Sequence, residues 1–320
     1  MSPIATSPTR FIGCDVGKRT VVVFDSVSGQ TRSSPNRKPD LVRFARGLDE
    51  ACLIVCEATG GYENALLQAL LDAGRAAHRA DARKVKAFIR SFGTLGKTDA
   101  IDARALAKYG EERHARLARW QAPDVVREEC QALVLLRVDL VRTRQAQRNR
   151  LAAPGAKAVA GYLRALLRTL DAQIRAVEAQ LRALIRRQPQ LARDEAVLRG
   201  IGGIGPATAA TLLALMPELG TISGKQAASL AGVAPHPRQS GASDAYRRTR
   251  GGRADVKRCL FMAAIVAARH NPALRAVYER LVANGKKPIV AVTAIMRKLI
   301  VIANARVRDA GGGEGHVQVS

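Results

Sequence analysis

Two kinds of hydrophobic pattern follow one another along the chain. Residues 10–25, RFIGCDVGKRTVVVFD, contain two β-branched runs around a Gly-Lys turn, which predicts a hairpin. Residues 52–74, CLIVCEATGGYENALLQALLDAG, predict a buried strand, a Gly-Gly break and a helix whose leucines share one face. Residues 81–93 and 99–112 predict two more helices. Strands followed by alternating strands and helices indicate an α/β domain over about residues 8–120.

The rest of the chain has a helical period. Residues 124–190 predict coiled-coil helices with a break at Pro154, because apolar residues recur there at steps of three and four. The seam consists of Leu163, Leu166, Leu170, Ile174, Val177, Leu181 and Leu184. Helices continue through a third region, 196–308, and the tail 309–320 is expected to be disordered. The predicted fold class is therefore α/β plus all-α, with the central seam offering a means of dimerising.

Charge narrows the choice of partner. The chain has 52 Lys and Arg against 27 Asp and Glu, a net charge of +25, while a 47% hydrophobic content is enough to build cores. Such an excess repels itself unless a polyanion neutralises it, which favours nucleic acid over an anionic membrane. No apolar run approaches the roughly 20 residues of a membrane span. Because the first residues also lack the apolar core of a signal peptide, we expect a cytoplasmic, nucleoid-associated protein.

Cysteine spacing points away from zinc and disulfides. The five cysteines form no Cys-x-x-Cys pair and stand mostly in apolar settings. Buried, reduced thiols are therefore expected.

Four acidic residues stand where carboxylates from separate elements can meet. Asp15 ends the first predicted strand and Glu57 ends the CLIVCE strand, and sites in open α/β sheets form beyond such strand ends. Asp99 and Asp102 are three residues apart and so share a helix face. Mg²⁺ takes oxygen ligands, and a two-ion site that cleaves phosphodiesters needs several converging carboxylates. These positions predict a site for Mg²⁺, with two ions.

Each acid also has a purely structural interpretation. Asp99 could cap its helix, with Asp102 favourably placed in the first turn, and Asp15 could be a turn residue. Glu57 is harder to explain in this way, because a carboxylate after apolar strand residues is costly to bury unless it is paired or metal-bound. In a chain that otherwise avoids negative charge, the placement of all four favours the metal interpretation.

Three segments in order resemble the DEDD transposases of bacterial insertion sequences: FIGCDVGKRTVVV, IVCEATGGYE and GKTDAIDARALA. The resemblance implies an N-terminal RuvC-like domain with the ribonuclease H-like fold. It also implies an Asp-Glu-Asp-Asp set that binds Mg²⁺, carried over here to Asp15, Glu57, Asp99 and Asp102. Gly17 stands where relatives often have another small residue.

A second candidate centre is the turn-rich stretch after residue 233. Ser240 precedes Gly241 there, among arginines whose forked side chains would bind phosphate oxygens and stabilise charge on a phosphorus under attack. Its hydroxyl is a candidate nucleophile for a phosphoserine intermediate. Ser243 competes with it, and a Ser-Gly pair is also common in ordinary loops. The same transposases carry a Ser-Gly followed by a basic Gly-Gly-Arg stretch, and this resemblance assigns the nucleophile to Ser240.

Basic residues predict nucleic-acid contacts in two regions. The helix before Pro154 presents arginines that form either a solvated face or a nucleic-acid-facing one. Residues 200–213, GIGGIGPATAATLL, resemble a helix-hairpin-helix element but could equally be a glycine-rich packing turn. The predicted contact residues are Arg137, Arg142, Arg144, Arg148, Arg238, Arg247, Arg248, Arg250, Arg253, Lys257 and Arg258.

Together these features predict a DNA transposase or recombinase that cleaves and rejoins donor and target DNA. The resemblance implies a structured bridge RNA that pairs with both DNAs. It also implies a homo-oligomer, a dimer or tetramer, in which the serine domain of one subunit completes the acidic site of another. The main alternative is a metal-dependent RuvC-like nuclease or junction resolvase that uses water as nucleophile. A non-catalytic nucleic-acid-binding protein is another, while the basic charge and missing adenosine motifs argue against an actin-like sugar kinase, despite a similar DVGKRT hairpin.

Overall fold

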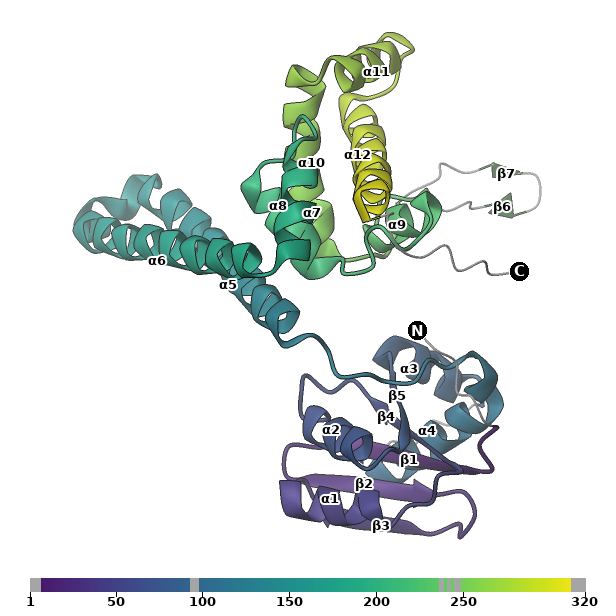
Figure 1. Cartoon of the computed structure of the whole chain (residues 1–320). Coiled ribbons are helices and arrows are strands. Elements are labelled where there is room, and N and C mark those ends of the chain that lie inside the picture. The colour runs from purple at the N-terminus through teal and green to yellow at the C-terminus, as the bar shows by residue number, and fades with distance from the viewer. Residues whose placement is uncertain (1–6, 93–97, 236–238, 241–242, 245–248, 312–320) are drawn as a thin grey trace. The chain divides into compact units, whose positions relative to one another are not determined.

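The computed structural model describes residues 7–92, 98–235, 239–240, 243–244 and 249–311 (Figure 1). The chain divides into two compact units, Met1–Pro123 and Asp124–Ser320. The first unit is mixed α/β, and the second is helical apart from a short hairpin.

The first unit is built on a five-stranded sheet with the order β3-β2-β1-β4-β5. Strand β1 runs antiparallel to β2 and parallel to β4, and β4 runs parallel to β5. The elements of this unit are β1 (Arg10–Val16), β2 (Thr20–Asp25), β3 (Thr31–Pro35), α1 (Lys38–Arg46), β4 (Cys52–Glu57), α2 (Asn64–Asp72), β5 (Ala76–Ala80), α3 (Ala82–Arg90) and α4 (Asp99–Arg113). This arrangement confirms the predicted mixed α/β fold class for the first unit and is consistent with a ribonuclease H-like domain.

Alternation along the strands divides the core of this unit into two layers. Ile12, Cys14 and Val16 of β1 pack with apolar side chains of α1 and α2. Phe11, on the other face of β1, packs with apolar side chains of α3 and α4. Both layers of helices are needed because the central strands β1 and β4 are apolar on both faces.

Helix α4 packs unusually close to the sheet at two glycines. A Cβ on Gly13 of β1 would lie 2.5 Å from the amide nitrogen of Ala107 and closer still to the carbonyl oxygen of Ala103. A Cβ on Gly110 would lie 2.8 Å from Val55. A side chain at either glycine would push α4 away from the sheet, so these glycines allow α4 to pack closely against β1 and β4.

The second unit begins with a long helical hairpin, α5 (Val125–Leu151) and α6 (Ala160–Arg187). Six of the seven predicted seam residues are buried within this chain, whereas Leu166 is 42% exposed and Leu167 is half-buried. The apolar period was therefore predicted well, but this seam is already occupied inside one chain.

A helical core follows the hairpin. Its helices are α7 (Pro189–Arg199), α8 (Pro206–Leu215), α9 (Gly224–Leu230), α10 (Ala254–His270), α11 (Pro272–Ala283) and α12 (Pro288–Gly311). Helix α12 is long and apolar enough by composition to cross a membrane. However, Ile295, Leu299 and Ile300 are buried in the core with side chains of α8 and α10, so α12 serves as a core helix of this unit.

Candidate active site

Asp15 and Glu57 lie at the same level on neighbouring strands. The parallel register of β1 and β4 pairs Cys14 with Cys56, so the next residue of each strand is Asp15 and Glu57, about 4.8 Å apart along the sheet. Side chains alternate along a strand, and both carboxylates therefore leave the face opposite the buried thiols of Cys14 and Cys56. That face is the one covered by α4, and both acids are half-buried there.

The first turn of α4 reaches the same end of the sheet. Gly110 lies over Phe11 at the start of β1, and Ala103 and Ala107 lie over Gly13, so α4 runs opposite to β1. Two strand residues beyond Gly13 span about 6.6 Å, which corresponds to four or five residues of helix. The level of Asp15 is therefore reached close to the start of α4.

This places the two remaining acids at the carboxyl ends of β1 and β4. Asp102 is half-buried and Asp99 is exposed. The cap of α4 is Thr98, whose hydroxyl oxygen accepts a hydrogen bond from the Ile101 amide at 3.3 Å. The alternative interpretation of Asp99 as the helix cap is therefore wrong, and its carboxylate has no capping role here.

Carboxylate oxygens are the ligands that a hard divalent ion takes. Mg²⁺ commonly takes one or two carboxylates and completes its shell with water and phosphate oxygens. Asp15 and Glu57 meet that requirement from adjacent strands, with Asp102 at the same end of the sheet. Among the residues that the structure describes, no three His, Cys, Asp or Glu side chains already form a closed metal-binding group. Asp15 and Glu57 are thus neighbouring carboxylates at the strand ends, and metal binding by the four acids stays a prediction.

Two residues that the sequence patterns did not single out organise the loops around these acids. Glu63, which is 2% exposed, accepts hydrogen bonds from the amides of Thr59 and Gly61 at 3.1 and 2.9 Å. Burial alone would raise the pKa of Glu63, but hydrogen bonds from its own amide and from the loop outweigh burial and lower it. The loop that follows Glu57 is therefore folded around a buried carboxylate.

Asn36 joins the two turns that flank Asp15 and Glu57. Its Nδ2 donates to the carbonyl oxygen of Gly17 at 2.9 Å and to that of Tyr62 at 3.1 Å. Its Oδ1 is buried and has no hydrogen-bond partner within the described residues. Asn36 follows β3, a strand that the sequence patterns did not predict, and Glu63 stands just before α2, so only the folded loops reveal their roles.

Ser240 belongs to the second unit and lies on a short hairpin. Strands β6 (Gln239–Ser240) and β7 (Ser243–Asp244) pair antiparallel, with Ser240 opposite Ser243. The backbone therefore keeps both serines at one level, and the choice between them remains a prediction.

The base of this hairpin is closed by backbone packing. A Cβ on Gly252 would lie 2.8 Å from the carbonyl oxygen of Leu230 and closer to the backbone of Gly232. The amide of Arg253 donates to the same Leu230 oxygen at 2.8 Å. We call the chain between α9 and α10, which carries Ser240, the serine loop. Its Gly-Gly-Arg sequence joins the end of this loop to the end of α9.

Arg253 has an internal role. Its guanidinium donates to both carboxylate oxygens of Glu218 at 2.6 and 2.7 Å and to the carbonyl oxygen of Leu215 at 2.7 Å. The hydrogen bonds from Arg253 lower the pKa of Glu218 despite its burial. In the structure Arg253 anchors the start of α10 to the end of α8, and its predicted contact with nucleic acid stays a prediction.

The other predicted contact residues of the second unit vary in their surroundings. Lys257 donates to the hydroxyl of Thr249 at 3.0 Å, Arg258 pairs with Asp255, and Arg250 is exposed. Arg238, Arg247 and Arg248 lie outside the described residues. Nucleic-acid contact by these residues stays a prediction.

The arginines of α5 largely face α6. Arg137 pairs with Glu178 at 2.7 Å and Arg144 with Asp171 at 2.9 Å, both within the helix–helix seam. Arg148 and Arg142 are more exposed, with side chains 52% and 56% accessible; Arg142 pairs with Asp139 at 3.1 Å. The structure therefore adds an interpretation that the sequence did not offer, in which part of the arginine row stabilises the hairpin.

The carboxylates at the ends of β1 and β4 and the serine on the hairpin of the second unit are groups expected in the class of DEDD transposases. Comparison with known families agrees with this class. A family model described as "Transposase", for DEDD enzymes of the IS110 type, matches residues 12–154, and the "Transposase IS116/IS110/IS902 family" model matches residues 195–279.

Individual relatives identify the family. The chain is 30% identical over 260 residues to the pilin gene-inverting protein of Moraxella lacunata, an alignment that covers 80% of each chain. It is 35% identical over 116 residues to the insertion element IS110 43.6 kDa protein of Streptomyces coelicolor, covering 35% of this chain and 28% of the relative. An IS900 42 kDa protein of Mycobacterium paratuberculosis is 26% identical over 76% of this chain. The chain belongs to the IS110 family of DEDD transposases, and it is a DNA transposase or recombinase.

Proposed function

We propose that this enzyme cleaves and rejoins donor and target DNA through a covalent phosphoserine on Ser240, with Mg²⁺ held by Asp15, Glu57, Asp99 and Asp102. The observation that carries the proposal is the register of β1 and β4, which brings Asp15 and Glu57 side by side beneath the first turn of α4. Membership of a DEDD family implies divalent-metal dependence in general. The choice of Mg²⁺, two ions and the serine are the finer steps proposed here.

Each protein group has a distinct task in this mechanism. The carboxylates would hold Mg²⁺, which when bound neutralises charge on the phosphate oxygens. The Ser240 Oγ attacks the phosphorus, forming the P–Oγ bond while the bond to a sugar oxygen breaks. The hydroxyl proton leaves Oγ, and the released sugar oxygen becomes a hydroxyl. In rejoining, a sugar hydroxyl attacks the phosphoserine and returns the proton to Oγ, so no bond energy is lost to water.

RNA guidance is the second part of the proposal. The net charge of +25 favours a polyanionic partner, and the family resemblance implies a bridge RNA. Sequencing of the RNA that copurifies with the protein, prepared without nuclease, tests this part. A discrete transcript encoded beside the gene is expected, and a random sample of cellular RNA would contradict it.

Oligomerisation would use the outer faces of the α5–α6 hairpin, because the predicted seam is already filled within the chain. Leu136 of α5 is 48% exposed, and Tyr162 and Leu166 of α6 are 81% and 42% exposed. We propose that these residues contribute to a dimer or tetramer in which the serine of one subunit serves the acids of another. The enzyme would act on DNA in the cytoplasm.

The experiment that separates this proposal from hydrolysis by water is detection of a covalent protein–DNA adduct. Wild type is expected to form the adduct with Mg²⁺ and not with EDTA, Ser240→Ala to form none, and Ser243→Ala to form it normally. Mass spectrometry of the trapped peptide locates the phosphoserine. Cleavage that persists in Ser240→Ala while requiring Asp15 would instead support the nuclease or junction-resolvase alternative.

A further inference from the structure

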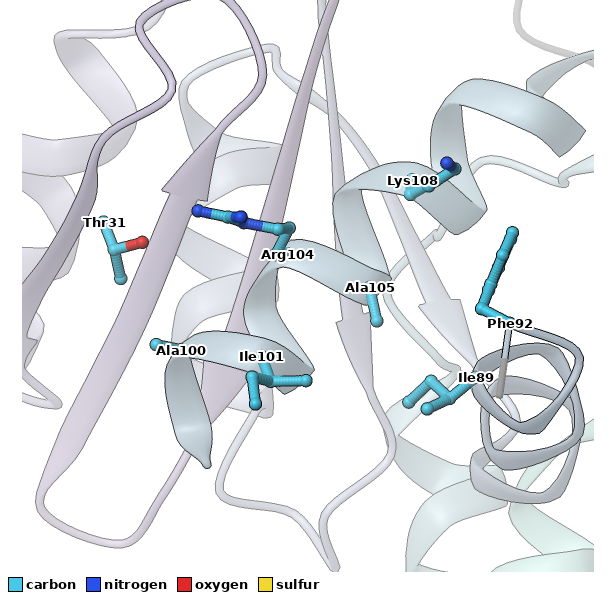
Figure 2. A pocket seen from close by; sticks show the side chains of 8 residues that line it. All are labelled: Thr31, Ile89, Phe92, Ala100, Ile101, Arg104, Ala105 and Lys108. Carbon is cyan, nitrogen blue, oxygen red and sulfur yellow. The ribbon is translucent and has the colours of Figure 1, made fainter. Parts of the chain in front are cut away.

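A pocket of about 500 Å³ lies along the first turns of α4, between Thr31 of β3 on one side and the end of α3 on the other (Figure 2). Ala100 and Ile101 line it at the start of α4, and Arg104 and Lys108 line it from the following turns. Ile89 and Phe92, at the end of α3 and just beyond it, complete the apolar wall. Figure 2 shows Lys108 beside Phe92 and Arg104 reaching toward the strands.

The two cations of this pocket are held by aromatic rings. Lys108 Nζ lies 4.8 Å from the centre of the Phe92 ring, and the Arg104 guanidinium lies 5.0 Å from the centre of the Phe24 ring. None of the described residues that line the pocket is acidic. Cation–π contacts orient a charge but do not neutralise it, so both side chains keep their positive charge.

An exposed aromatic ring beside cations suits a nucleotide better than a simple anion. Phe92 is 47% exposed in a chain with only 4% aromatic residues. Bases stack on such rings while nearby Lys and Arg contact phosphates, whatever the base. A base inside a duplex is stacked on both faces and cannot reach such a ring, so the ligand that fits is an unpaired nucleotide.

The position of the pocket connects it to the acidic residues. Ala100 and Ile101, which line the pocket, lie between Asp99 and Asp102 in one helical turn, a rise of about 5.4 Å. We propose that the pocket holds an unpaired nucleotide of the DNA strand, next to the phosphodiester on which the acids act. The proposal rests on the proposed function, because it takes the strand at these acids to be DNA.

The test measures the binding of the full-length protein to a short single-stranded oligothymidylate and to its abasic counterpart, in EDTA so that no cleavage occurs. Phe92→Ala is expected to weaken binding of the base-containing strand roughly tenfold and to leave the abasic strand unchanged. Phe92→Tyr should retain wild-type binding to both strands. Phe92 also packs against Phe88, with the ring centres 4.9 Å apart. If the Ala variant is unstable, Phe92→Leu keeps an apolar side chain there and should show the same selective loss of binding.

Charge variants give a second, different signature. Lys108→Ala is expected to weaken the binding of both strands. It should also reduce the slope of log affinity against log salt concentration by about one. Lys86→Ala, an exposed α3 lysine that does not line this pocket, removes the same charge and serves as control. Equal effects of Lys108→Ala and Lys86→Ala would overturn the assignment.

Three outcomes decide the proposal. If Phe92→Ala loses the same factor of affinity for the base-containing and the abasic strand, the proposal is overturned, even if wild type forms the Mg²⁺-dependent adduct. Tighter Phe92-dependent binding of oligouridylate than of oligothymidylate would overturn the assignment to DNA in favour of RNA. Discrimination between base and abasic strands by Phe92, with no adduct in wild type, would support the pocket and contradict the proposed function instead.

Discussion

Replacing Gly13 with alanine tests whether α4 must touch β1 for the acids to meet. The added Cβ would lie 2.5 Å from the Ala107 nitrogen and closer still to the Ala103 carbonyl oxygen, whereas ordinary contact begins at 3.4 Å, so α4 would have to retreat by at least about 1 Å. The obstacle is helix backbone, which cannot rotate away as a side chain can. Overpacking costs typically about 1–3 kcal/mol, and for this rigid obstacle we expect about 3 kcal/mol, or roughly 10 °C in the melting temperature of the first unit.

The same displacement moves Asp102 away from Asp15. A misplacement of about 1 Å can cost on the order of 100-fold in rate, so adduct formation by Gly13→Ala should fall by about that factor. Thermal unfolding by circular dichroism and adduct kinetics measure the two effects. Gly47→Ala is the control, because its Cβ would meet only an ordinary contact of 3.5 Å and its φ is −78°. A Gly13→Ala protein that melts and reacts like this control would refute the proposed position of α4.

Other predictions follow from single contacts. Asn36→Asp replaces a double donor with an acceptor facing two carbonyl oxygens, so unfolding should become easier by about 2 kcal/mol in thermal melts. The hydrogen bonds from Arg10 lower the pKa of Asp25 to about 2. The Asp25 carboxylate therefore stabilises the fold above pH 3.8, and this stabilisation is lost as the pH falls toward 2. In pH-dependent melts, Asp25→Asn should reduce the fall of the melting temperature between about pH 4 and about pH 2. Glu218→Gln should cost about 1 kcal/mol in the same assay and slow adduct formation, because the serine loop loses its anchor. Burial raises the pKa of Cys56 to about 12, so mass spectrometry should find this thiol unalkylated at pH 8 until the protein unfolds.

The strand-end positions of Asp15 and Glu57 were predictable because a short continuous apolar run is typical of a strand that is buried on both faces. The run before Glu57 is buried residue by residue, and the register of β1 and β4 follows from two such runs packing in parallel. The predicted helices at 81–93 and 99–112 are confirmed with small changes of boundary. Within the first unit, the sequence patterns did not predict β3, α1 or β5. Strands β3 and β5 consist of TRSSP and AAHRA, edge strands that depend on their neighbours rather than on their own propensity.

The contacts between distant residues could not be predicted in the same way. Arg137 meets Glu178, which is 41 positions later, only because the α5–α6 hairpin has one particular register. Arg253 likewise follows a basic run, which predicts contact with solvent or phosphate. Its guanidinium instead pairs with Glu218, which is 35 positions earlier in the chain. Composition describes the excess of arginine, but the fold decides which arginines remain available to a polyanion.

Binding of Mn²⁺ to the full-length protein, followed by electron paramagnetic resonance with a Mg²⁺ competition, tests the central claim most directly. Asp15→Asn and Glu57→Gln should each weaken Mn²⁺ binding at least about tenfold, because each removes a carboxylate that would bind the ion directly. Glu50→Gln, which neutralises a side chain 94% exposed on the same unit, should bind as wild type does. Unchanged Mn²⁺ affinity in both Asp15→Asn and Glu57→Gln would contradict the account.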